Sequence, residues 1–121
     1  MDEISDIMLD NMRKSLIKLA KNKEHKRYQE FSDEFMLGYD MRDIQDRQKI
    51  GIILGRISES EHTNGRPLLS VFIQHEDGLP GSGFFTMAEQ LGRYMPTFMD
   101  KKQFVAREML YAYNYWNTHK E

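Results

Sequence analysis

The chain has 121 residues, of which 40% are hydrophobic and 30% are charged, so it can bury one core and is too short for two. Its 17 basic and 19 acidic residues give a net charge of -2, which excludes a general attraction to nucleic acid or acidic membranes. It has no cysteine, which excludes disulfides and thiolate sites and favours a reducing compartment. We therefore expect one cytoplasmic domain over residues 1–121, without a membrane partner.

Two helices are predicted at the beginning of the chain. Over residues 4–20, apolar side chains recur at three- and four-residue steps, with Asp2 or Ser5 available as the N-terminal cap. A weaker helix is predicted over residues 24–37, because aromatic residues recur on one face and Gly38 then breaks the pattern.

A third helix is predicted from residues 40–43 to Thr63, after which Gly65 supplies the left-handed stop that helices favour. Gly51 and Gly55 lie inside this helix, and each costs about 1 kcal/mol relative to alanine. We interpret the two glycines as sites of close packing against a neighbouring element, in preference to close approach of a ligand.

The composition changes in the middle of the chain. Residues 68–73 form an almost continuous apolar run of β-forming residues, which predicts a strand buried on both faces. Residues 74–85 contain an Asp-Gly turn signal and an aromatic pair, which predict that the chain returns as a second short strand. The expected class is therefore α+β, mainly helical, with a small antiparallel β element between the N-terminal helices and a long C-terminal helix.

Two further helices are predicted at the end of the chain. The first is short and covers residues 86–92. The second begins after Asp100, which forms a capping box with Gln103. This long helix has a wide apolar and aromatic face, which we assign to core or interface packing rather than to a binding site.

The segment at residues 78–83 is the strongest candidate for a site, because it holds three glycines and a proline directly before a helical stretch. Glycines let several backbone amides turn toward one point, and a helix N-terminus adds partial positive charge, so the segment is suited to an anion such as phosphate. The alternative is a wide hairpin or Ω-type loop whose glycines meet backbone constraints. The predicted ligand-binding residues are Arg66, Ser70, Gly81, Ser82, Gly83, Phe84 and Arg93.

A metal site is the second candidate, because histidines and carboxylates lie at both ends of the predicted strand. They are Glu59, Glu61 and His62 before it, and His75, Glu76 and Asp77 after it. A strand of this length separates its ends by roughly 20 Å, so the two groups are not expected to meet on one metal. We therefore predict no metal, no cofactor and no catalytic residue, and interpret these side chains as solvated acidic surface.

The segment over residues 65–92 also resembles a pattern found in small bacterial and phage proteins. The pattern consists of GRPLLS at residues 65–70, G-x-P-G-x-G-F-F at residues 78–85 and a short helix after it. The resemblance implies a microbial or phage setting, including bacterial defence, and it transfers no catalytic residue.

These observations favour a small non-enzymatic binding protein that holds a phosphorylated or nucleotide-like anionic ligand. One alternative is a metal-dependent phosphodiester hydrolase that uses the histidines and carboxylates. Another is a protein-interaction module or homo-oligomer built on the nine methionines and the aromatic C-terminal helix. A nucleic-acid reader is disfavoured, because the basic residues are dispersed and balanced by acids.

Overall fold

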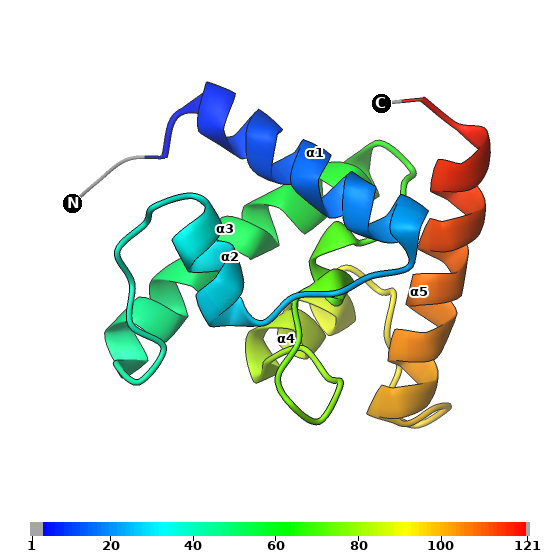
Figure 1. Ribbon diagram of the computed structural model, residues 1–121. Coiled ribbons are helices and arrows are strands. Elements are labelled where there is room, and N and C mark those ends of the chain that lie inside the picture. Colours follow the sequence, from blue (N-terminus) through cyan, green and yellow to red (C-terminus); the bar gives the residue numbers. More distant parts are fainter. Residues whose placement is uncertain (1–3, 121) are drawn as a thin grey trace.

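Residues 4–120, which the computed structural model describes, form five α-helices and one short 3-10 helix (Figure 1). In chain order these are α1 (Asp6–Asn22), α2 (Tyr28–Glu34), α3 (Ile44–Thr63), η1 (Leu69–Phe72), α4 (Ser82–Gln90) and α5 (Lys101–Thr118). In Figure 1, α1 crosses the top of the molecule, α5 closes its right side, and α4 lies at the bottom below α3.

The helix ends follow the capping signals of the sequence. The Ser5 side chain accepts a hydrogen bond from the Met8 amide at 3.1 Å, which begins α1 as expected, whereas Asp2 lies outside the described residues. Asp100 and Gln103 form the predicted capping box of α5, with both hydrogen bonds present. Gly65 adopts a φ of 71° after α3, the left-handed conformation that suits glycine.

The predicted α+β class is wrong. Within residues 4–120 there is no sheet, and strand pairing is limited to an isolated parallel bridge between Lys26 and Ile73. The apolar run that was expected to form a strand instead forms η1. A short, continuous apolar run is equally compatible with a strand and with a buried helical turn, so its periodicity does not distinguish the two.

Side chains of distant helices accept the hydrogen bonds of amides at the beginning of η1 that a neighbouring strand would accept in a sheet. The Leu68 amide donates to Glu108 Oε2 of α5 at 2.8 Å, and the Ser70 amide donates to Ser58 Oγ of α3 at 3.0 Å. At the end of η1, the Lys26 amide donates to the Phe72 carbonyl at 3.0 Å. A buried backbone group must find a partner, and here side chains and one neighbouring segment supply them.

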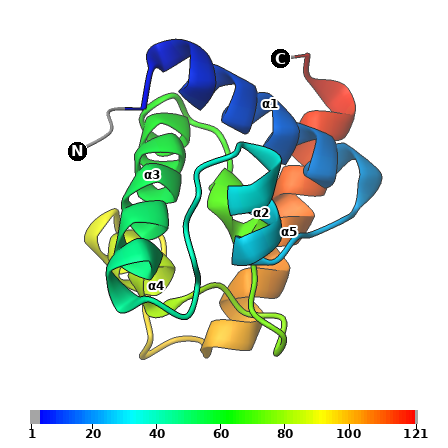
Figure 2. The same cartoon turned by 60° about the vertical axis from the view of Figure 1, so that its left-hand side comes forward.

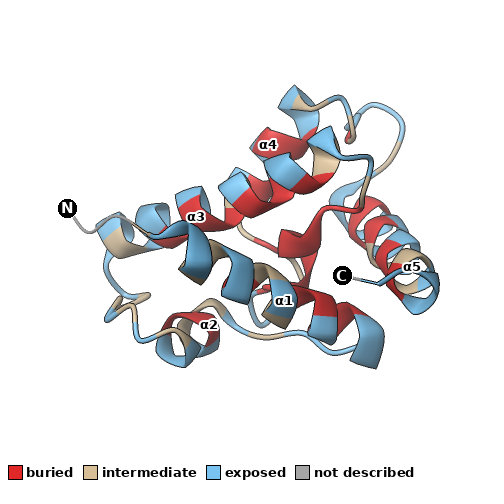
Figure 3. Cartoon of the chain, turned by 90° about the horizontal axis from the view of Figure 1, so that it is seen from above, coloured by how far each residue is buried: buried red, intermediate tan, exposed pale blue. Residues whose placement is uncertain are grey.

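η1 is the centre of the core. It packs against α1, α3 and α5, and in Figure 3 the ribbon enclosed by these helices is coloured as buried. All four residues of η1 are buried, and Leu69, Val71 and Phe72 have no exposed surface. The segment therefore fills the space in which the helices meet, which is why its residues are almost all apolar.

The predicted return strand is also wrong, because α4 begins at Ser82 and includes the aromatic pair Phe84 and Phe85. Their rings lie 6.0 Å and 6.5 Å from the ring of Phe104 in α5, measured between centroids. Aromatic residues favour strands only weakly, and packing against α5 decides the local conformation here. No helix in the described part of the chain is both long and apolar enough to cross a membrane.

Candidate functional site

Arg66, a predicted ligand contact, is paired with a carboxylate of its own chain. Its Nε donates to Glu61 Oε1 at 2.9 Å and its Nη2 donates to Glu61 Oε2 at 3.0 Å. The fully buried Glu61 also accepts from Arg13 Nε at 2.8 Å. The hydrogen bonds to Glu61 raise the pKa of the Arg66 guanidinium further above its ordinary value. The guanidinium donors of Arg66 are thus engaged by Glu61.

Arg93 is held in the same way. Its Nη2 donates to both carboxylate oxygens of Glu108, at 2.8 Å and 2.6 Å, and its Nη1 lies 3.3 Å from His62 Nδ1. Glu108 is buried and also accepts from the Leu68 amide, so Arg93 neutralises a carboxylate that supports η1. Ser70, another predicted contact, is buried with its Oγ 2.6 Å from Ser58 Oγ.

The loop before α4 uses most of its amides internally. The amides of Gly78, Leu79 and Gly81 donate respectively to the His75 carbonyl, to Asp77 Oδ1 and to the Tyr28 hydroxyl. The amides of Ser82 and Gly83, in the first turn of α4, have no hydrogen-bond partner within residues 4–120. Most amides of the predicted anion site are therefore already hydrogen-bonded, and only those at the N-terminus of α4 are available to a ligand.

Tyr28 fixes this loop to α2. Its hydroxyl accepts from the Gly81 amide at 2.7 Å, and its ring packs against that of His75 in a tilted arrangement with centroids 4.8 Å apart. Burial raises the pKa of the Tyr28 hydroxyl above its ordinary value, and the hydrogen bond from Gly81 opposes that shift. A Cβ atom at Gly81 would lie 3.3 Å from His75 Nε2 and 3.4 Å from the Tyr28 oxygen, so a side chain here would pack tightly against both residues.

Replacing Tyr28 with phenylalanine is expected to lower the free energy of unfolding by about 1 kcal/mol, because the Gly81 amide then loses its acceptor. The wild-type contribution of Tyr28 should be full below its unfolded pKa of 10.0 and fall as the pH rises above it, because the folded state holds the proton more tightly. Urea unfolding at neutral and alkaline pH tests both points. Tyr39→Phe is the control, and equal effects of the two substitutions would contradict the role given to Tyr28.

A groove of about 1280 Å³ runs between the beginning of α2, the exposed face of α3, the loop before α4 and α4 itself. In Figure 2, α3 stands upright at the left, α2 lies to its right, and α4 lies at its lower end. Four of the seven predicted ligand-binding residues line the groove: Gly81, Ser82, Gly83 and Phe84. Arg66, Ser70 and Arg93 do not line it.

Three arginines that were not predicted as ligand contacts also line this groove: Arg27, Arg47 and Arg56. None of their guanidinium groups forms an ion pair with a described carboxylate. Arg47 Nη1 donates to the Met41 carbonyl at 2.8 Å, which orients the side chain without neutralising it. The groove is therefore lined by three guanidinium groups that form no ion pair within the described residues.

The two glycines of α3 also open onto the groove. A Cβ atom placed on Gly51 or on Gly55 would meet nothing within 4 Å, so the expectation that they pack closely against a neighbouring element is wrong. Exposed isoleucines flank them, since Ile44 is 61% exposed and Ile52 is 66% exposed. The sequence showed the unusual glycines, and only the fold shows that the space beside them is empty.

The residues of the metal hypothesis are distributed over different environments. Glu61 binds Arg13 and Arg66, His62 contacts Arg93, and His75 packs against the ring of Tyr28. In the described range, no three His, Asp or Glu side chains are grouped closely enough to hold a metal ion. Glu59 and Glu76 line the groove instead, where they add negative charge beside the arginines.

Comparisons of the chain with protein-family models, with curated proteins and with solved structures found no match. The function is therefore inferred from the chemistry of the groove.

Proposed function

We propose that the protein is a binding module, without a catalytic step of its own, that holds an anionic ligand in the groove between α2, α3 and α4. The observation that carries the proposal is which of the arginines form ion pairs with carboxylates of the chain. Arg13, Arg42, Arg66 and Arg93 pair with carboxylates of the chain, whereas the three groove arginines do not. Uncompensated guanidinium groups around one concavity favour a ligand that supplies carboxylate or phosphate oxygens.

The N-terminus of α4 also favours an anionic ligand in the groove. The free amides of Ser82 and Gly83 lie at the groove wall, where the partial positive charge of a helix N-terminus adds to that of the arginines. Phosphorylated small molecules, including nucleotides, remain within this ligand class. The ligand contacts predicted for Arg66, Ser70 and Arg93 stay predictions and are not part of the groove. We place the protein in the cytoplasm of a bacterial or phage-infected cell.

Replacing Arg47 and Arg56 together by alanine is expected to weaken binding of a groove ligand by at least about tenfold for each of the two arginines that the ligand contacts, because a charge-assisted hydrogen bond contributes about 1.5–3 kcal/mol. Thermal-shift screening finds the ligand, using inorganic phosphate, mono-, di- and cyclic nucleotides, and peptides rich in aspartate and glutamate. Isothermal titration calorimetry then measures the affinity for each variant.

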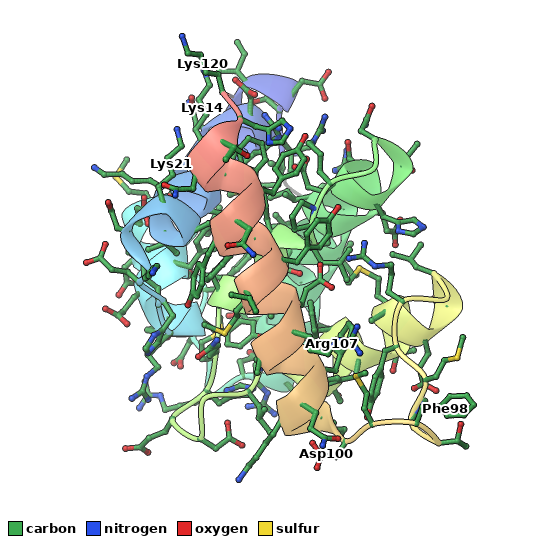
Figure 4. The ribbon with its side chains drawn as sticks, turned by 90° about the vertical axis from the view of Figure 1, so that its right-hand side faces the viewer. Lys14, Lys21, Phe98, Asp100, Arg107 and Lys120 are labelled. Atoms are coloured by element: carbon green, nitrogen blue, oxygen red, sulfur yellow. The ribbon has the colours of Figure 1, made fainter. Side chains whose placement is uncertain are left out.

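Arg107→Ala is the matched control. Arg107 is exposed on α5, away from the groove, and forms no ion pair with a described residue (Figure 4). This variant should bind like the wild type. The proposal is wrong if neither a phosphate compound nor an acidic peptide stabilises the protein. It is also wrong if Arg107→Ala lowers the ligand affinity as much as the double variant does.

A further inference from the structure

We infer that the occupant of the groove is an acidic, partly apolar peptide segment of a partner protein that lies along α3; this deepens the proposed function and rests on it. The first argument is the length of the site. The lining residues of α3 extend from Ile44 to Glu59, which corresponds to about 22 Å along the helix axis at 1.5 Å per residue. An extended peptide of about six residues covers this length.

The positions of the arginines match a linear ligand. Arg47 and Arg56 are about two and a half helical turns apart, which places them about 13 Å apart along the axis and on opposite flanks of α3. A single compact anion reaches one of these flanks. A chain that crosses α3 obliquely places one acidic group near each arginine, so the charge pattern favours a ligand with separated anionic groups.

Other groove residues favour a peptide over a polyphosphate or a nucleic-acid strand. Glu59 and Glu76 line the same groove and repel a ligand that carries negative charge at every unit. Ile44 and Ile52 are largely exposed, and apolar side chains of a peptide would remove them from water. The net charge of -2 adds no long-range attraction for nucleic acid.

The α3 glycines fit a ligand whose backbone comes close to the helix. Gly51 and Gly55 lie between the two arginines, they line the groove, and the space beside them is empty. Glycine in a helix interior lowers stability by about 1 kcal/mol relative to alanine, and no packing contact of the described chain explains either residue. Close approach of a peptide backbone over these two positions accounts for both.

A selection experiment tests the inference without knowledge of the partner. A library of random peptides, each about twice the length that spans the groove, is displayed on phage and panned against the wild-type protein and against R47E/R56E. We expect the wild type to enrich peptides in which aspartate or glutamate alternates with apolar residues. Synthetic copies of these peptides should bind R47E/R56E at least tenfold more weakly, and R107E like the wild type.

A second pair of variants tests the glycines. G51A and G55A should melt at a higher temperature than the wild type, yet bind the selected peptides several-fold more weakly. Gln45→Ala, an exposed α3 residue that does not line the groove, controls for an alanine substitution in this helix. Unchanged peptide affinity in both glycine variants would overturn the close approach over α3.

The outcomes separate this inference from the proposed function. If phosphate or a nucleotide binds in an Arg47- and Arg56-dependent manner while panning enriches no acidic peptide, the groove is an anion site and the peptide inference is wrong. If neither class of anion binds, both are wrong. Enriched acidic peptides that bind R47E/R56E as tightly as the wild type also overturn the inference.

Discussion

Replacement of Glu61 by glutamine is expected to lower the free energy of unfolding by about 3 kcal/mol, because the substitution leaves two guanidinium groups without their counter-charge. Glu61 has no exposed side-chain surface and binds Arg13 and Arg66 together. The two arginine side chains are 21% and 23% exposed, so they can turn partly toward water. This places the expected loss near the lower end of the range for a broken buried ion pair.

Glu59→Gln is the matched control for this prediction. Glu59 lies two positions earlier in α3, is exposed and forms no ion pair within the described chain. Its substitution should change the free energy of unfolding by less than about 0.5 kcal/mol. Urea unfolding followed by far-ultraviolet circular dichroism measures both variants. A loss in Glu61→Gln as small as that of the control would show that the Glu61 cluster contributes little to stability.

Replacement of Phe72 by alanine is expected to lower the free energy of unfolding by about 3–5 kcal/mol. Phe72 has no exposed surface and lies at the end of η1, and its ring is 5.8 Å from that of Tyr113 in α5. η1 packs against three of the α-helices, so a cavity here removes contacts from several elements at once. A loss of this size tests whether the segment at residues 68–73 lies at the centre of the core.

Phe98→Ala controls for removal of a phenylalanine ring. Phe98 is 80% exposed in the segment before α5, and Figure 4 shows it pointing away from the body of the protein. The same urea titration should give nearly the wild-type stability for this variant. If Phe72→Ala lowers the free energy of unfolding as little as Phe98→Ala does, the segment at residues 68–73 is not the centre of the core.

The positions of the long helices were predictable from the sequence because they depend on short-range signals. Ser5 and Asp100 cap their helices through groups three residues away, and Gly65 ends α3 by a local left-handed turn. The apolar stripes of α1 and α5 likewise indicate which face is buried, since the period of a helix is fixed. These features need no knowledge of where the rest of the chain lies.

The partners of the charged residues were not predictable in the same way. Arg93 and Glu108 are 15 residues apart, and Arg13 and Glu61 are 48 apart, so no local pattern links either pair. Arg66 lies beside the Gly-Pro segment in the sequence and was therefore a candidate ligand contact, but α3 brings Glu61 to it. The groove arginines were missed for the converse reason, because only the fold shows that they have no such partner.

The sequence by itself determined the three long helices α1, α3 and α5, the caps of α1 and α5 and an unusual pair of glycines in α3, because propensity, capping and periodicity act over a few residues. Tertiary structure alone decided that residues 68–73 form a buried helical turn, since a strand needs a partner strand and the chain provides Glu108 and Ser58 instead. It also decided which arginines are neutralised and which remain free around the groove. Both decisions depend on distances between elements that are far apart in the chain, and such distances are not encoded in any local run of residues.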